Sequence, residues 1–585
     1  MLQAEGITFE IDTPDGELKL LNNVCFKAPR GHFMAIVGPS GCGKTTLLKS
    51  IAGMISITDG TYYWDGRDLN EEDFEPSEIG FVPQFSIAYD QLSVDESIES
   101  AARLRCKVSS IDELDDRIDN ALEVTGMDSI ADRDVKILSG GQKRRLALAM
   151  ELVSEPSLLL CDEVTSGLDP RSEHTIVELL HDISRKNGCI VVSVTHSLAH
   201  LELYDSILVM HQGNLAYHGS PSTMLHYFGV KSLEEIYPKL QEREGAAWGR
   251  SWEKYRDSYY ARMEQERQKK IDAGELKLEA SDPKETANTE TDTEEAEAEE
   301  NDDVLEVPGF FSQFFCLLGR RWRIFSRDKG QLILQAAMIL LFPILVAMFT
   351  DQGEGQIVSF SATQDIQNLL QDIKTQEINM KTASAVSGII MFEVILLGLM
   401  GSNNAAREVA GERTIMEKEK YAGMRPSAYL CSKIAFLCTL VLLQSVWMYL
   451  FVDFFWDRGG GMTHLSFLIL ANAAMTFVCL GISSLAKTAD QASLLSIYLV
   501  GFQLPLSGAV LALPEYVEGI IRPFISAYWS WSGSIKALNA DVFHAVKNVL
   551  ETGLTDAHIC YTVLGVHVVA GIILSYIGIR RSQWD

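Results

Sequence analysis

The feature that most constrains this chain is a set of long apolar stretches confined to its C-terminal half. A helix needs about 20 mostly apolar residues to cross the hydrocarbon core of a bilayer. Residues 1–310 read instead as a soluble protein. The sequence therefore predicts a soluble part followed by an all-α membrane domain over residues 331–585, with six spans at about 331–350, 383–402, 430–452, 463–486, 491–513 and 558–579.

The charges that flank these stretches predict their direction. Arginine and lysine precede the first span, lie between the second and third and between the fourth and fifth, and follow the sixth. Because positive charge near span ends stays in the cytoplasm, both termini are expected inside. Segments 351–382, 453–462 and 514–557 would then face outward, and the first of them contains an apolar set that could form an external helix: Ile366, Leu369, Leu370 and Ile373.

The first 230 residues alternate short apolar strands with helical patterns, which is typical of an α/β sheet protein. The runs at 33–38, 157–162 and 189–196 are continuously apolar, as expected for strands covered on both faces. Each run ends in a polar residue or a glycine turn. Ligands of open parallel sheets bind at such carboxyl ends.

Three segments connect the two parts. Residues 231–273 are predicted to form a helical extension. Five of its side chains share one helix face: Trp248, Trp252, Tyr255, Tyr259 and Met263. This aromatic stripe is expected to pack on the soluble domain or on a second copy of it, or else to form a ligand-binding box. Residues 274–308 are acidic and predict a solvated, disordered linker. Residues 309–330 predict an amphipathic helix at the membrane surface. The net charge of -29 argues against nucleic acid as a partner.

The motif GPSGCGKT follows the first apolar strand and precedes a helical pattern, which is the context of a phosphate-binding loop. Its glycines let backbone N–H groups curl around phosphate oxygens, Lys44 brings a positive charge to the β- and γ-phosphates, and the Thr45 hydroxyl can ligate Mg²⁺. The motif predicts a nucleoside triphosphate site made by Gly38, Pro39, Ser40, Gly41, Cys42, Gly43, Lys44, Thr45 and Thr46.

A second buried strand, LLLCD at residues 158–162, ends in two consecutive acids. Asp162 is predicted to hold the magnesium ion, and Glu163 is predicted to polarise the water that attacks the γ-phosphate. Taken alone, two acids could merely end a strand. The motifs around them favour the catalytic interpretation.

These motifs resemble those of the ATP-binding-cassette ATPases. LSGGQ at residues 138–142 is similar to the family signature and lies at the family's distance before LLLCDE. Gln84 in GFVPQFS resembles the Q-loop, Asp169 in SGLDP the D-loop, and His196 in VTHS the switch histidine. The domain order and the stretches MELVSEPSLLLCDEVTSGLDP and ERTIMEKEKYAGMRPSAYL resemble the G (White) subfamily of half-transporters.

The resemblance implies an α/β P-loop ATPase domain with a helical subdomain over residues 1–230, with ATP and Mg²⁺ as cofactors. It implies that Gln84 joins Thr45 and Asp162 at the magnesium, and that His196 senses the γ-phosphate. Two residues depart from the family pattern. Val164 replaces a proline, and Ile11 stands where many relatives have an adenine-stacking aromatic, for which Phe9 is a substitute.

The signature itself offers hydroxyl and backbone N–H donors at a helix N-terminus, which is an anion site. In the family, this site caps the ATP of the other subunit. One chain carries one phosphate loop and one signature, so two complete sites need two chains, as a homodimer or a heterodimer. The residues implied at this contact between chains are Ser139, Gly140, Gly141, Gln142 and Asp169.

Glu393 lies midway along the second predicted span. Carboxylates inside spans are costly and often functional. The residue either serves packing, protonated or hydrogen-bonded to a neighbouring helix, or contacts a substrate or proton. The hypothesis favoured by its position is that it faces the central cavity of a dimer. Gln503 shares this ambiguity, and so do Gln335, Gln444 and Asn472.

The sequence as a whole predicts an ATP-driven half-transporter of the plasma (inner) membrane, surrounded by lipid and with its ATPase domain in the cytoplasm. Few polar groups in the spans favour a lipid-like or hydrophobic substrate, and the order of ATPase then spans favours export. Two alternatives stay open. One is an ATPase that signals or pulls on an outside partner without moving a substrate, and the other is an importer that depends on an external binding protein.

Overall fold

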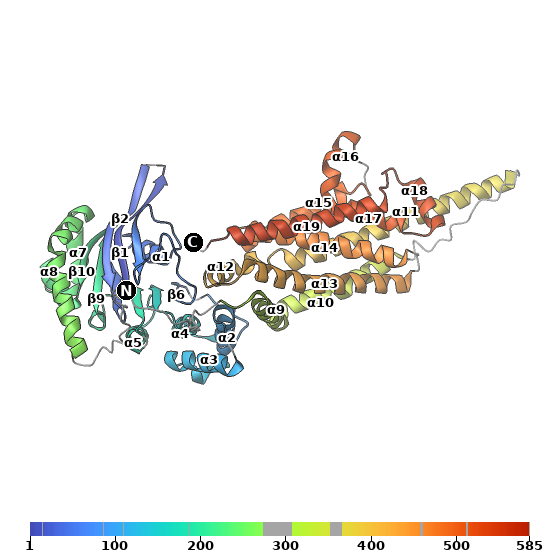
Figure 1. Cartoon of the computed structure of the whole chain (residues 1–585). Helices are drawn as coiled ribbons and strands as arrows, with labels where there is room; N and C mark the ends of the chain where they lie inside the picture. Colours follow the sequence, from blue (N-terminus) through green and yellow to red (C-terminus); the bar gives the residue numbers. More distant parts are fainter. Residues whose placement is uncertain are drawn as a thin grey trace, which may run out of the picture. The chain divides into compact units, whose positions relative to one another are not determined.

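The computed structural model describes residues 1–14, 16–85, 87–108, 110–186, 188–272, 307–350, 366–456, 460–509 and 513–583 (Figure 1). They form two compact units. Unit 1 comprises Met1–Ser312, Tyr421–Met424 and Gln583–Asp585, and unit 2 comprises Gln313–Lys420 and Arg425–Ser582. The predicted acidic linker lies outside the described residues, except for its last two positions.

The described strands of unit 1 form two sheets. The four-stranded antiparallel sheet has the order β2-β1-β4-β5, and the six-stranded sheet has the order β10-β9-β3-β8-β7-β6. In the larger sheet every pair is parallel except β10 with β9. The strands are β1 Leu2–Thr13, β2 Gly16–Ala28, β3 Phe33–Val37, β4 Asp59–Trp64, β5 Arg67–Asp68, β6 Ile79–Val82, β7 Leu158–Asp162, β8 Ile190–Val194, β9 Ser206–His211 and β10 Asn214–Gly219.

All five residues of β3, of β7 and of β8 are buried, because helices cover both faces of a parallel sheet. The predicted apolar strands are therefore confirmed. The helices of unit 1 are α1 Lys44–Ile51, α2 Val94–Arg105, α3 Ile111–Thr125, α4 Gly140–Leu152, α5 Pro170–Lys186, α6 Pro221–Phe228, α7 Ile236–Gln241 and α8 Gly245–Asp272. Helices α2, α3 and α4 share a separate hydrophobic core, which is the implied helical subdomain.

Helix α8 carries the predicted aromatic stripe and packs on β10 (Figure 1). Trp248, Trp252 and Tyr259 are buried in the core of unit 1, where they meet the rings of Tyr217 and other residues. The predicted packing on the soluble domain is confirmed for these three residues. It is wrong for Tyr255, which is 46% exposed because it lies on another side of the helix.

The described residues of unit 2 form helices joined by short connections, without a strand. Helix α14 packs on α19, α11 and α13 (Figure 1). Close approach to α19 depends on small residues, since a Cβ on Gly571 would lie 2.3 Å from the Phe477 carbonyl oxygen. The helices are α9 Phe310–Arg327, α10 Lys329–Ala347, α11 Ile366–Ala405, α12 Arg413–Tyr421, α13 Pro426–Phe455, α14 Gly461–Leu485, α15 Ala489–Leu506, α16 Glu515–Ile521, α17 Ser526–Lys536, α18 Ala540–Val549 and α19 Ala557–Arg581.

Five helical segments in the described part of the chain are long and apolar enough to cross a membrane: Lys329–Ala347, Gln376–Tyr421, Pro426–Phe455, Gly461–Leu485 and Ala557–Arg581. The second of them contains most of α11 together with α12. The predicted fifth span corresponds to α15, which ends at Leu506 rather than near residue 513 and is not among the five. The external helix expected within 351–382 is the beginning of α11, which starts at Ile366 and continues without a break into the second predicted span.

The predicted amphipathic helix corresponds to α9. Two of its four arginines turn inward, where Arg321 is buried with Glu408 at 2.6 Å and Arg320 is buried with Glu419 at 2.5 Å. Arg323 and Arg327 are exposed. The rings of Phe315 and Trp322 are exposed instead. A helix with paired arginines inside and aromatic rings outside suits the surface of a bilayer, and this location stays a prediction.

Candidate functional site

The predicted chemical motifs follow four strands that are neighbours in the larger sheet. The phosphate loop begins after β3, His196 follows β8, Asp162 ends β7, and Gln84 follows β6. The strand order β3-β8-β7-β6 is parallel throughout, so the four carboxyl ends meet at one edge of the sheet. Residues that are up to 158 positions apart in the sequence numbering, such as Gly38 and His196, therefore flank a single site.

The phosphate loop has the backbone that its glycines permit. Gly38 has φ 153°, Gly41 has φ 75°, and Gly43, which caps the N-terminus of α1, has φ 102°. The Lys44 ammonium donates to the carbonyl oxygens of Gly38 and Pro39, both at 3.0 Å. Burial lowers the pKa of Lys44. The cation is thus held inside the curl of the loop, at the N-terminus of α1, where anions are favoured.

Two of the three predicted magnesium ligands are in contact. The Thr45 hydroxyl donates to Oδ1 of Asp162 at 3.1 Å. Burial raises the pKa of Asp162 above its usual value, although the hydrogen bond from Thr45 opposes part of this rise. A hydroxyl next to a carboxylate offers the hard oxygen donors that Mg²⁺ prefers. Gln84, the third predicted ligand, is bonded to Glu163 instead.

The Glu163 carboxylate is held from both sides. Gln84 Nε2 donates to Oε2 at 2.8 Å, and His196 Nε2 lies 2.5 Å from Oε1. The backbone of Glu163 has φ 47°, in the left-handed region, and its N–H donates to the Val194 carbonyl oxygen at the end of β8. A non-glycine residue in this region is strained and often functional. The structure therefore brings together the predicted base, Q-loop and switch histidine.

The signature lies at the N-terminus of α4, on the helical subdomain. Ser139 caps the helix in a reciprocal box, accepting from the backbone N–H of Gln142 at 3.3 Å while its own N–H donates to the Gln142 side chain at 3.0 Å. Ser139 and Gly140 are exposed. A Cβ on Gly140 would meet nothing within 4 Å, and one on Gly141 would meet only Ser172, at 3.9 Å or more. Packing within the part of the chain that the structure describes therefore does not explain these glycines.

Asp169 caps the following helix, α5. Its Oδ1 accepts from the backbone N–H groups of Arg171 and Ser172, both at 3.1 Å, and its Oδ2 accepts from the Ser172 hydroxyl at 2.6 Å. The hydrogen bond from the Ser172 side chain is the main reason why the pKa of Asp169 is lowered. Phe9, the predicted substitute for an adenine-stacking aromatic, packs partly against the core of the ATPase unit.

The two predicted substrate residues of the membrane unit are buried inside its own helix bundle. Glu393 has no exposed surface, and its Oε2 lies 3.2 Å from Nε2 of His464, which is equally buried. Gln503 accepts from the Ser526 hydroxyl at 3.2 Å and from the Ala527 N–H at 3.1 Å. Glu393 thus has a polar partner within its own bundle, as a carboxylate among apolar helices requires, and its predicted role toward a substrate or a cavity between subunits stays a prediction.

Another polar cluster of the membrane unit contains Gln335, Gln444 and Asn472, which the sequence left ambiguous. Asn404 Nδ2 donates to Gln444 Oε1 at 2.9 Å, and Gln335 Nε2 donates to Asn404 Oδ1 at 2.8 Å. Asn472 Nδ2 also donates to Gln444, at 3.1 Å. These side chains connect α10, α11, α13 and α14, so they satisfy one another in the interior of the bundle.

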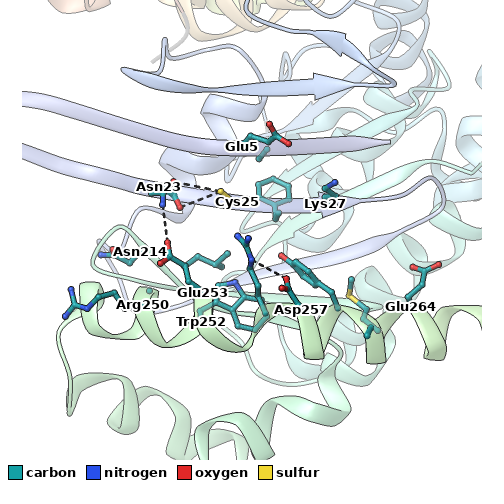
Figure 2. Close-up of a pocket in the computed structure, with 18 of the residues that line it drawn as sticks. Glu5, Asn23, Cys25, Lys27, Asn214, Arg250, Trp252, Glu253, Asp257 and Glu264 are labelled. Carbon is teal, nitrogen blue, oxygen red and sulfur yellow. Dashed lines mark hydrogen bonds and ion pairs between the residues drawn. The ribbon is translucent and has the colours of Figure 1, made fainter.

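A cavity of about 1000 Å³ in the ATPase unit lies away from these motifs, between the β1–β2 pair and α8 (Figure 2). Glu5, Cys25 and Lys27 line it from the strands, and Arg250 and Trp252 line it from the helix. Asn23 Nδ2 donates across it to Glu253 Oε1 at 3.2 Å. Its lining mixes cations with carboxylates, unlike a phosphate site, and includes none of the motif residues.

One contact of the site has no signal in the sequence. The Tyr237 hydroxyl, on α7, donates to the His196 carbonyl oxygen at 3.3 Å. The sequence pattern predicts a helical extension there but does not single out this tyrosine. Its contact follows from the return of the chain to the edge of the sheet after β10.

The fold and these contacts define a P-loop ATPase domain joined to a helical membrane domain. Residues 21–166 match the family described as ABC transporter, and residues 312–529 match the family described as ABC-2 type transporter. By this order of domains, the chain belongs to the ABC transporters and is a membrane protein.

Two curated relatives illustrate the similarity. The chain is 28% identical to the ABC transporter ATP-binding/permease protein Rv1747 of Mycobacterium tuberculosis, over 95% of this chain and 59% of that protein. It is 30% identical to ABC transporter G family member 7 of Arabidopsis thaliana, over 60% of this chain and 50% of that protein. The chain thus spans between half and three fifths of the length of these two relatives.

Among solved structures, the chain is similar to the dimeric structure of a post-hydrolysis state of the ATP-binding cassette MJ0796 bound to ADP and Pi. The identity is 27%, and the match covers 38% of this chain and 98% of that one, with a TM-score of 0.35.

Proposed function

We propose that this chain is a half-transporter that uses ATP to export a lipid-like or hydrophobic substrate, with its ATPase domain in the cytoplasm and its spans in the plasma (inner) membrane. The observation that carries the proposal is the meeting of the phosphate loop, Asp162, Glu163, Gln84 and His196 at one edge of a sheet, in a chain whose second half matches the ABC-2 type transporters.

Each side chain has a defined task in hydrolysis. Lys44 and the backbone N–H groups of the loop bind the phosphates, while the Thr45 hydroxyl and the Asp162 carboxylate would hold Mg²⁺, which supplies charge neutralisation between the phosphates. Glu163 accepts a proton from the attacking water. His196 and Gln84 keep that carboxylate oriented, because each bonds to one of its two oxygens.

Transport is tested by reconstituting the purified protein in lipid vesicles with ATP added outside. Molecules whose ATPase domain faces outward should then move fluorescent lipids or hydrophobic dyes toward the lumen. Movement should require ATP and should stop in the Glu163→Gln variant. Steady ATP hydrolysis without movement of any compound in a broad panel would favour the alternative function, an ATPase that signals or pulls on an external partner.

We also propose that two chains form two composite ATP sites, as a homodimer or with a related half-transporter. Ser139 and Gly140 are exposed, and neither Gly140 nor Gly141 has a close neighbour that requires glycine. An exposed helix N-terminus with a hydroxyl and free space suits a phosphate that approaches from outside the chain.

The pairing predicts complementation between two inactive variants. Lys44→Ala disables the phosphate loop, and Gly141→Asp places a carboxylate at the signature, where it would repel phosphate. Co-assembled in equal amounts, they should recover up to about a quarter of the wild-type ATPase rate, because random pairing in a twofold-symmetric dimer makes half of the pairs heterodimers with one intact site each. Activity is measured on the unselected mixture, whereas pairs purified through two different tags are all heterodimers and should reach up to about half of the wild-type rate. Zero recovery in verified heterodimers would contradict composite sites.

A further inference from the structure

The switch segment that carries His196 is held at three backbone points. The Thr195 N–H donates to the Ile36 carbonyl oxygen at 3.1 Å, and the Ser197 N–H donates to the Thr195 hydroxyl at 3.0 Å. The third point is the 3.3 Å bond from the Tyr237 hydroxyl to the carbonyl oxygen of His196 itself. The first two belong to the sheet edge and its turn, whereas the third comes from the extension that follows the sheet.

The Tyr237 hydroxyl has a second neighbour, the first glycine of the phosphate loop. Burial raises the pKa of Tyr237 to about 12, and a backbone hydrogen bond from Gly38 opposes that rise. A hydroxyl can accept one hydrogen bond while it donates another. This oxygen therefore lies beside the beginning of the phosphate loop while it donates to the backbone of the switch histidine.

The helix that carries Tyr237 is firmly held. Ile236 and Leu240 of α7 have no exposed surface. The indole N–H of Trp248, on α8, donates to the Leu240 carbonyl oxygen at 3.0 Å. At the start of α8, the Gly245 N–H donates to the side chain of Gln212 at 2.9 Å. Because these contacts hold α7 near both of its ends, the position of Tyr237 beside the ATPase site is fixed.

We propose that Tyr237 is a positioning residue of the ATPase site. Its hydroxyl sets the backbone of His196 against the phosphate loop, so that the imidazole stays on the Glu163 carboxylate when ATP is bound. The helical extension therefore takes part in hydrolysis as well as in packing. This inference rests on the proposed ATPase function, and it assigns to that site a residue outside the family motifs.

Tyr237→Phe is the direct test, because it removes the hydroxyl and keeps the ring. The loss of one hydrogen bond should lower the ATPase kcat by about three- to tenfold. Affinity for a non-hydrolysable ATP analogue should stay within about twofold, since phosphate contacts remain. Thermal unfolding should be nearly unchanged. Tyr255→Phe, which alters an exposed ring of the neighbouring helix, should leave kcat unchanged.

A double-mutant cycle separates positioning from general destabilisation. If Tyr237 acts through His196, then Tyr237→Phe should cost little further rate in a His196→Ala background, measured as single-turnover hydrolysis. The same loss in both backgrounds, or a kcat of Tyr237→Phe within about twofold of wild type, would overturn the inference while leaving the proposed ATPase intact. Absence of ATP hydrolysis in the wild-type protein would overturn both.

Discussion

Glu163→Gln should reduce ATP hydrolysis by about 10²- to 10⁴-fold, the usual contribution of a positioned general base. The amide keeps the size of the carboxylate but cannot take a proton from water at neutral pH. ATP binding should persist, because the phosphates are held by the loop and not by this side chain. The variant should therefore accumulate in an ATP-bound state, measured as nucleotide that stays with the purified protein after incubation with labelled ATP.

Glu155→Gln is a matched control for this prediction. Glu155 also has a left-handed backbone, with φ 51°, and it precedes the same strand whose end carries Glu163. Its side chain is about half exposed and lies 3.9 Å from Arg117, away from the site. Normal turnover is expected for this control. Turnover of Glu163→Gln within about tenfold of wild type would refute the assignment of the base.

Gly43→Ala should weaken nucleotide binding by distorting the phosphate loop. The backbone at this position has φ 102°, and an added Cβ would lie 2.6 Å from the Leu20 carbonyl oxygen. A backbone atom of a paired strand cannot turn aside as a flexible side chain can, so the loop must shift. The expected loss of ATP affinity is at least about tenfold, because misplaced N–H donors lose charge-assisted bonds of about 1.5–3 kcal/mol each. It is measured by titration with a fluorescent ATP analogue.

Gly41→Ala separates backbone strain from this clash. Gly41 belongs to the same loop and has φ 75°, but a Cβ there would meet nothing within 4 Å. Both substitutions place alanine in the left-handed region, at a cost of about 1–2 kcal/mol. If steric contact with Leu20 is the cause, Gly43→Ala should be clearly more damaging in both ATP affinity and melting temperature. Equal effects would show that the contact is unimportant.

Most of the ATPase site could be predicted from local sequence, since each motif combines a strand end with a particular turn. GPSGCGKT contains the glycines that its backbone requires, and all three have positive φ. The aromatic stripe of α8 was predictable in the same way, from helical spacing. Tyr255 is the exception. Its exposure depends on how α8 lies on β10, which the spacing of residues alone does not predict.

The contacts of the polar residues in the membrane domain could not be predicted from local sequence. An isolated glutamate in an apolar run fits a packing role and a functional role equally well, and the sequence does not show which side chain it contacts. Glu393 meets His464 across 71 positions of the chain, and both are fully buried. The arginines of α9 likewise required the fold, because their glutamate partners come from 87 and 99 positions away.

The sequence by itself determined the two kinds of domain, the phosphate loop, the paired acids and the signature, because each rests on hydrophobic pattern or on residues that are neighbours in the chain. Only the tertiary structure decided which of these residues touch. The order β3-β8-β7-β6 brings Gln84 and His196 to opposite oxygens of Glu163, and the fold returns Tyr237 to the backbone of His196. Contacts of this kind arise from strand order and helix packing, which depend on the burial of the whole core rather than on any local run of residues.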